Sequence, residues 1–290
     1  MDVTRISLVR PVDLEVNVYR VGDTLVDTAH PDPATRSALR DELESGRLTG
    51  VDRVLLTHPH LDHVGGSLTI PSLATRPHLV PTGVPELLSD YTQFVGQFRT
   101  PVLTMARATL DDPDPYMHRG IPVRDDYDGA RIAVDRELTD GDPVDLGPYR
   151  VRVIDTPGHS ARHVGLHHPP SGTVFSGDLV SQSGYFTWAP DCDLVQYVES
   201  LERIRRLDPD RLLPGHGPPI TNPATQLTDA LDKVETNLER IRQAVRRRES
   251  ATARDVAVAV FGASGRGERP LTLAVAAHFD YLEATGDVTL

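Results

Sequence analysis

The chain has 290 residues, of which 30 are basic and 42 acidic, and its formal net charge is −12. Its single cysteine, Cys192, excludes an internal disulfide framework and a zinc finger with cysteine ligands, so any metal site must use His, Asp or Glu. The first residues lack the apolar core of a signal peptide and no apolar run approaches the roughly 18 residues of a membrane span, so we expect a cytoplasmic protein with no membrane partner.

The first 221 residues alternate between β-rich runs and helical stretches. Pro33 opens a predicted helix over residues 33–43, and a second helix is predicted over residues 194–207. Residues 51–56 form a short apolar run, which is typical of a buried strand. Strands are predicted at residues 6–9, 16–20, 24–27, 51–56, 149–154, 173–175 and 211–213.

The pattern weakens from residue 85 to about residue 141, and the span 87–136 is long for a connection. We expect this insertion to carry helices that could form a pocket wall. Two aromatic groups are candidate contacts with a partly apolar small-molecule substrate, with core packing and a homodimer contact as the alternatives. They are Tyr91, Phe94, Phe98 and Tyr116 in the insertion, and Tyr185, Phe186 and Trp188 further along the chain.

From residue 222 the chain is predicted to be helical, which favours two domains, 1–221 and 222–290. A long helix is followed by predicted helices at 252–261, capped by Thr252, and at 273–283, and by a short β-rich run at 288–290. The long helix is marked by one apolar stripe with spacings of four and three. The stripe consists of Leu227, Leu231, Val234, Leu238, Ile241 and Val245.

The strongest local signal follows the predicted buried strand 51–56, where residues 57–63 read THPHLDH. This segment holds four potential metal ligands in six positions, which is far more specific than a lone pair of histidines. Because His58 and His60 are two residues apart, an extended segment turns both to one side, while Asp62 and His63 can face a second position.

Three further segments place a polar residue beside glycine directly after a predicted strand. They are Thr-Pro-Gly-His at residues 156–159, Ser-Gly-Asp at 176–178 and Pro-Gly-His-Gly at 214–217. Ligands at strand ends, on loops over a rigid scaffold, are the arrangement that a metal site requires.

In this order, these motifs resemble those of the metallo-β-lactamase superfamily, and the likeness covers the chain to about residue 221. The resemblance implies an α+β fold, a four-layer αβ/βα sandwich with its metals at one edge of two packed sheets. It implies two metal positions joined by a bridging carboxylate. The first position has His58, His60 and His159, the second has Asp62, His63 and His216, and Asp178 is the bridge.

The resemblance also points to supporting residues. Asp27 matches a position whose carboxylate orients a ligand histidine, with a strand-end turn residue as the alternative. His163, four residues after His159, is a candidate for a similar outer role. Five of the remaining histidines are interpreted as ordinary surface or core residues, and they are His30, His78, His167, His168 and His278. His118, in the insertion, is interpreted as a solvated loop residue, with a contact to substrate as the alternative.

Imidazole and carboxylate ligands suit Zn²⁺, so we expect two zinc ions, although iron or manganese would also fit. Two such metals can share a hydroxide that attacks a carbonyl carbon. We therefore expect a hydrolase that acts on a thioester, ester or lactone. Among relatives, the residue at the position of Asp62 is also placed to accept a proton, which makes Asp62 the candidate catalytic residue.

Two other functions compete with this hypothesis. The tail resembles the winged-helix tail of a superfamily branch that contains ribonuclease-like and glyoxalase II-like members, which favours a metal-dependent endoribonuclease or phosphodiesterase. Against RNA, the tail has nine basic and ten acidic side chains, so about −11 of the charge lies in residues 1–221. The second alternative is a mononuclear iron persulfide dioxygenase, because some relatives hold one iron with the same motif and oxidise persulfides.

Five arginines lie near the end of the long predicted helix of the tail. A phosphate-binding patch there would use Arg240, Arg242, Arg246, Arg247 and Arg248, whereas a solvated helix end is the plainer interpretation.

Overall fold

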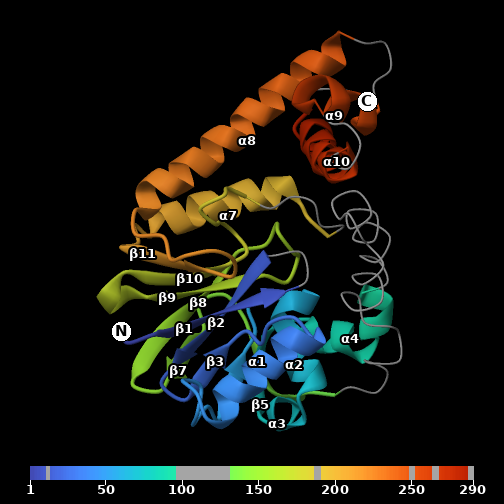
Figure 1. Ribbon diagram of the computed structural model, residues 1–290. Helices are drawn as coiled ribbons and strands as arrows, with labels where there is room; N and C mark the ends of the chain where they lie inside the picture. Colours follow the sequence, from blue (N-terminus) through green and yellow to red (C-terminus); the bar gives the residue numbers. More distant parts are fainter. Residues whose placement is uncertain (11–13, 96–130, 186–190, 248–251, 263–267, 287–290) are drawn as a thin grey trace.

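The computed structural model describes residues 1–10, 14–95, 131–185, 191–247, 252–262 and 268–286, and in them two sheets pack face to face (Figure 1). The first sheet has the order β1-β2-β3-β4-β5-β6, antiparallel at β1, β2 and β3 and parallel from β3 to β6. Its strands are β1 (Thr4–Arg10), β2 (Leu14–Val21), β3 (Thr24–Val26), β4 (Arg53–Leu55), β5 (Pro77–Pro81) and β6 (Ala133–Leu138).

The second sheet has the order β11-β10-β9-β8-β7, in which only the β10–β11 pair is parallel. Its strands are β7 (Pro143–Leu146), β8 (Tyr149–Asp155), β9 (Val164–His168), β10 (Thr173–Gly177) and β11 (Arg211–Pro214). The predicted strands are all present, and β4 is shorter than the predicted 51–56.

Helices cover the outer face of each sheet. On the first sheet these are α1 (Pro33–Glu44), α2 (Leu61–Thr69), α3 (Pro71–Ala74) and α4 (Val84–Ser89). On the second it is α7 (Leu194–Arg206). Helix α8 (Pro223–Arg246) crosses α7 and extends toward α9 (Ala253–Phe261) and α10 (Glu268–Ala284), which pack on the other helices rather than on the sheet (Figure 1). None of the helices in the described ranges is both long and apolar enough to cross a membrane.

Alternating side chains divide each strand between two core layers, because neighbours in a strand point to opposite faces. Leu25 packs under the helices of the first sheet, and its neighbour Val26 packs between the sheets. Likewise Val174 packs under α7, and Phe175 packs between the sheets. The order helix, sheet, sheet, helix confirms the expected four-layer α+β sandwich.

The tail is helical wherever it is described. Four residues of the predicted stripe are buried along α8, and the other two, Leu231 and Val245, are partly buried. Helix α9 begins at the predicted Thr252 cap, and α10 begins five residues before the predicted 273. One apolar cluster continues from Ile154 and Val174 in the second sheet to Val256 on α9 and Phe279 on α10. The division into domains 1–221 and 222–290 and the winged-helix form stay predictions, and residues 288–290 lie outside the described ranges.

The insertion is described only at its two ends. Its first end carries α4 and a short helical stretch at residues 91–95, and its last residues enter β6. Phe98, Tyr116 and His118 lie outside the described residues, as do Phe186 and Trp188. The pocket wall expected from residues 87–136 therefore stays a prediction.

Candidate metal centre

The predicted ligands come together at one edge of the two sheets, where the strands that carry them end. His58 and His60 lie between β4 and α2, and Asp62 and His63 lie in the first turn of α2, which begins at Leu61. The other three come from the second sheet: His159 follows β8, Asp178 follows β10 and His216 follows β11. The site therefore takes side chains from both halves of the sandwich.

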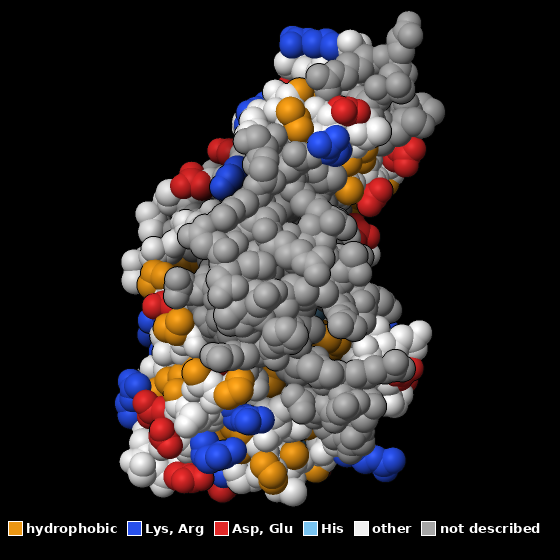
Figure 2. Space-filling model, turned by 45° about the vertical axis from the view of Figure 1, so that its right-hand side comes forward, with side chains coloured by type: hydrophobic (Ala, Val, Ile, Leu, Met, Phe, Trp, Pro, Cys, Tyr) orange, Lys and Arg blue, Asp and Glu red, His pale blue; other side chains and the backbone are white. Residues whose placement is uncertain are grey.

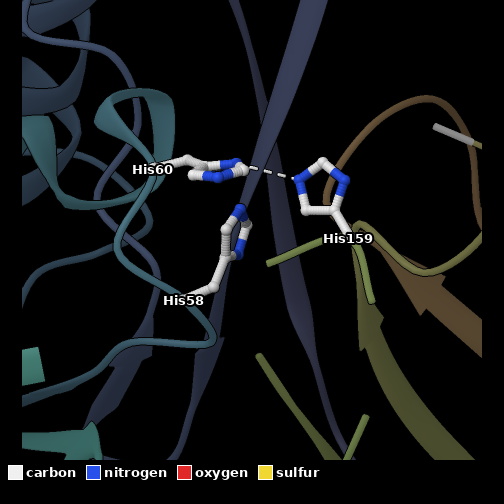
Figure 3. A group of neighbouring side chains, drawn as sticks. All are labelled: His58, His60 and His159. Carbon is white, nitrogen blue, oxygen red and sulfur yellow. Dashed lines mark hydrogen bonds between the residues drawn. The ribbon is translucent and has the colours of Figure 1, made fainter. Parts of the chain in front are cut away.

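The first group of ligands is made of three histidines whose rings converge (Figure 3). His159 Nε2 lies 2.9 Å from His60 Nδ1, and the ring of His58 lies 4.6 Å from that of His60 and 5.1 Å from that of His159. Burial lowers the pKa of His159 to about 4 and that of His58 well below its ordinary value, so neutral rings with available lone pairs face one another.

The second group is held together by Asp178. Its Oδ1 lies 3.3 Å from His63 Nε2, and its Oδ2 lies 3.0 Å from His216 Nε2. His216 Nε2 is also 3.4 Å from Asp62 Oδ2. Because Asp178 Oδ2 is 3.5 Å from His159 Nε2, one carboxylate contacts both groups, as a bridging ligand would.

Three buried atoms of the site make no hydrogen bond: His58 Nε2, and the pair His63 Nε2 and Asp178 Oδ1, which lie 3.3 Å apart without the geometry of one. A buried polar atom without a partner costs about 1–3 kcal/mol, and a cation among the three would remove that cost. Together His58, His63 and Asp178 form a group whose ligand atoms lie within 4.8 Å of one another. Nitrogen and carboxylate donors in this number fit a divalent ion such as Zn²⁺.

A glycine keeps this space open. A Cβ on Gly215 would lie 2.2 Å from Asp178 Oδ1 and 2.7 Å from His63 Cε1. The residue before His216 therefore has to be glycine for the two groups to approach each other.

Asp27 contacts His63, one of the predicted ligands. It is 2 % exposed, and its Oδ2 accepts a hydrogen bond from His63 Nδ1 at 2.9 Å. The same carboxylate accepts from Thr57 N and Thr57 Oγ1, both at 2.8 Å. Thr57 Oγ1 in turn lies 3.0 Å from His58 Nδ1, so one carboxylate fixes two ligand rings.

The sequence interpretation missed Asp191. Its Oδ1 lies 3.1 Å from His60 Nε2, across 131 residues of chain. Burial is the largest single influence on the pKa of Asp191 and would raise it, but the contacts with His60, Ser160 and His159 together outweigh burial and lower it. No local pattern marks Asp191, because its partner is brought to it only by the fold.

His163 makes a hydrogen bond to the backbone of Asp178, and its ring lies 5.1 Å from that of His58. Its Nε2 accepts a hydrogen bond from Asp178 N at 3.0 Å, so its Nδ1 carries the hydrogen and donates to Thr156 Oγ1 at 2.7 Å. Burial lowers the pKa of His163 to about 3, which keeps this arrangement neutral. Its predicted outer role stays a prediction.

Other residues singled out in the sequence have structural contacts. Tyr91 is buried and its hydroxyl donates to Pro59 O at 2.8 Å, and the buried ring of Phe94 lies 6.5 Å from that of His60. His78 contacts Ser67 outside the metal centre. Four more histidines, namely His30, His167, His168 and His278, also belong to none of the three ligand groups in the described ranges.

Comparison with known proteins places this geometry in a family. The model of the metallo-beta-lactamase superfamily matches residues 12–216. The chain is 28 % identical over 306 residues to the probable metallo-hydrolase YqjP of Bacillus subtilis, covering 95 % of this chain and 90 % of that one. It is 35 % identical to the human acyl-coenzyme A thioesterase MBLAC2, but only over 83 residues, which are 27 % of this chain and 30 % of that one.

A solved structure shares the fold over nearly the whole chain. The metallo-beta-lactamase family protein TTHA1429 of Thermus thermophilus superposes with a TM-score of 0.74 and 20 % identity, covering 99 % of this chain and 95 % of that one. At this identity the likeness establishes the fold alone. The family model, in contrast, matches more than half of the chain, so the protein belongs to the metallo-β-lactamase superfamily.

Proposed function

We propose that this metal-dependent hydrolase holds two divalent metal ions, with zinc as the favoured metal. It would hydrolyse a thioester, ester or lactone by attack at the carbonyl carbon. The observation that carries the proposal is the position of Asp178, whose two carboxylate oxygens lie against ligand histidines of both groups. Among carbonyl substrates we favour a thioester, because one relative is named a thioesterase.

The ligand side chains would divide between the ions as the motifs indicate. His58, His60 and His159 would hold the first, and Asp62, His63 and His216 the second. When bound, such a pair lowers the pKa of water to near neutral and polarises the substrate oxygen. The chain's own task is then to fix the two positions and to move a proton.

Asp62 is the candidate for the group that accepts and returns this proton. Its side chain is 13 % exposed, more than that of Asp178 at 5 %, so it lies nearer the solvent side of the site. We propose that Asp62 accepts a proton from the attacking water and returns it to the leaving group.

Cys192 does not supply a nucleophile in this proposal. Burial, together with the neighbouring carboxylates of Asp191, Asp193 and Asp280, raises the pKa of its thiol to about 12. A thiol with that pKa is almost entirely protonated at neutral pH and is a poor nucleophile.

The charge distribution argues against RNA as the substrate. On the face shown in Figure 2, the basic and acidic side chains of the described residues are interspersed rather than gathered into one basic patch. In the tail, Arg240 donates to Val260 O and lies 4.8 Å from the ring centre of Phe261, and Arg242 pairs with Glu239. These two arginines are used within the tail, and Arg248 lies outside the described residues. A cytoplasmic location and a homodimer stay predictions.

The test is a metal analysis combined with a substrate panel of thioesters, esters, lactones and single-stranded RNA. We expect about two zinc ions per chain and thioester turnover that His60→Ala abolishes, while His167→Gln, at a buried histidine of β9 outside the ligand groups, retains both. RNA cleavage abolished by His60→Ala, without thioester turnover, would favour the endoribonuclease. About one iron per chain with oxygen uptake on a persulfide would favour the dioxygenase.

A further inference from the structure

The strand β2 has an unpaired edge at the metal centre. It pairs with β1 from Leu14 to Arg20, but with β3 only from Tyr19 onward. The loop that carries His216, at the end of β11 in the other sheet, lies along this free edge. There Asn17 N donates to Gly215 O at 2.7 Å.

Side chains of β2 hold the same loop on both sides of His216. Asn17 and Tyr19 are two residues apart and share one face of the strand. Asn17 Nδ2 donates to Pro214 O at 2.8 Å and to Gly217 O at 2.7 Å, and Tyr19 Oη donates to Pro214 O at 2.6 Å. The ring is held as well, because His216 Nδ1 donates to the backbone oxygen of Glu15 at 2.5 Å, which leaves Nε2 facing the site.

Arg5 fixes the orientation of the Asn17 amide. Arg5 Nε donates to Asn17 Oδ1 at 2.8 Å, so the amide nitrogen must face the loop carbonyls. Arg5 Nη2 also donates to Gly217 O at 3.1 Å and lies 3.3 Å from a carboxylate oxygen of Glu15. Every polar atom of the Asn17 side chain thus has a partner, and the residue has no exposed surface.

We infer that Asn17, oriented by Arg5, is a positioning residue that sets the place of His216 and thereby the occupancy of the metal position formed by Asp62, His63 and His216. The inference rests on the proposed two-metal centre. Asn17 contacts no ligand atom, and it acts through the backbone on both sides of a ligand.

An aspartate at position 17 is the sharpest probe. Asn17→Asp keeps the size and the oxygen that accepts from Arg5, but it turns a carboxylate oxygen toward Pro214 O and Gly217 O. Three oxygens that repel one another would displace the loop and His216 with it. Loss of such an outer contact weakens metal binding by about 10–100-fold in known sites. We expect the second equivalent of metal to bind at least about tenfold more weakly in Asn17→Asp, with the first equivalent unchanged.

The experiment titrates metal-free protein with Zn²⁺ against a chromophoric chelator and with Co²⁺ by absorption. Arg5→Met, which removes the orienting donor at a partly exposed position, should give a smaller loss confined to the second equivalent. The matched control is Arg53→Gln, because Arg53 also links the two sheets, through Asp145 O, but at the opposite end of the strands from the ligands.

The outcomes separate the inference from the proposed function. If wild type and Asn17→Asp bind both equivalents equally, the positioning role of Asn17 is overturned and the two-metal centre stands. If both equivalents weaken together in Asn17→Asp, the role is merely structural and the inference is again overturned. If wild type binds a single ion, the two-metal proposal fails and the inference fails with it.

Discussion

Asp27 has an unusual backbone for a residue with a side chain. Its φ is 59°, in the left-handed region that costs L-residues about 1–2 kcal/mol and that Asp and Asn tolerate best. This conformation follows directly after β3 and turns the carboxylate toward Thr57 and His63. The strain thus coincides with the contact that fixes two ligand rings, as it often does at functional sites.

The first prediction concerns Asp27→Asn. Asn accepts the same backbone conformation, so the change removes the charge and one acceptor without altering the turn. We expect metal affinity to fall by about 10–100-fold, because His63 loses a full carboxylate partner. Competition with a chelator measures this. The control is Asp208→Asn, since exposed Asp208 also has a positive φ, 48°. Equal losses in both variants would contradict the role of Asp27.

The second prediction concerns His78 and the pH dependence of stability. Burial lowers the pKa of His78 to about 4, although its hydrogen bond to Arg76 O opposes the shift. Between pH 6.5 and 4 the unfolded chain therefore binds a proton that the folded chain refuses. His78 thus stabilises the fold fully above pH 6.5, and this contribution, about 3 kcal/mol, is lost as the pH falls toward 4.

Urea unfolding of wild type and His78→Gln at pH 8, 6 and 4.5 checks this. Both proteins should lose stability on acidification, but His78→Gln by a smaller amount. Identical losses in the two proteins would contradict the prediction, because they would mean that the folded protein accepts the proton on His78 as readily as the unfolded chain does.

At the scale of single residues, the motifs were enough to predict which seven side chains meet at the edge of the sheets, because four of them lie in one heptapeptide and each of the others lies beside a glycine after a strand. Asp191 and Asn17 could not be found in this way. Their partners lie 131 and 197 residues away, so only the folded chain brings them together. A residue that supports a ligand through the backbone leaves no pattern in the sequence.

At the scale of elements, one face of α7 supports two ligand-bearing loops. Four residues of this face follow one another at spacings of four, three and three, beginning at the N-cap of α7. Three of them donate hydrogen bonds to backbone oxygens of residues 155–158, just before His159, and one donates to the backbone oxygen of Asp178. The packing is close, since a Cβ on Gly158 would lie 2.3 Å from the backbone of Tyr197. The donors are Asp193 N to Gly158 O, Tyr197 Oη to Asp178 O, Ser200 Oγ to Pro157 O and Arg203 Nη1 to Asp155 O.

The third prediction concerns Tyr197→Phe. The hydroxyl of Tyr197, fully buried, donates to the backbone oxygens of Asp178 and Leu179. Its removal leaves those oxygens without this donor, so we expect the free energy of unfolding to fall by about 1–2 kcal/mol. Tyr149→Phe is the control, because the Tyr149 hydroxyl accepts from Asp2 N at an exposed site. Denaturant unfolding distinguishes them, and a fall no larger in Tyr197→Phe than in Tyr149→Phe would show that α7 does not support the loop.

The elements that the sequence did not predict have physical reasons for being missed. β5 has proline at both ends, and β6 carries three charged residues, which weakens a strand signal in each. The five residues of β9 are all buried but include a glycine and two histidines. Helices with an amphipathic stripe or a cap, such as α8 and α9, were predicted because their signals are local.

At the scale of the whole molecule, the division of the strands between two sheets came from the family resemblance rather than from periodicity. Strand pairing is a long-range property, and alternation tells only that a strand is buried on one or both faces. The packing of the tail on the rest of the chain is likewise a long-range property that local patterns do not reveal. The hydroxyl of Tyr185 lies 2.8 Å from Asn237 Nδ2 on α8 and 3.1 Å from His278 Nε2 on α10, a connection between the body and two helices that no stripe predicts.

The last prediction follows from the position of the centre across both sheets. Ligands after β4 belong to one half of the sandwich and those after β8, β10 and β11 to the other, so bound ions would join the halves. Ions that bind only the folded chain stabilise it by about 2.7 kcal/mol at a hundredfold excess over Kd. For a chain of this size we expect chelation to lower Tm by at least about 5 °C, and added Zn²⁺ but not Mg²⁺ to restore it, since Mg²⁺ prefers oxygen ligands. Thermal unfolding with chelator, Zn²⁺ or Mg²⁺ measures this, and a Tm that does not change on chelation would mean that the ions contribute nothing to holding the two sheets together.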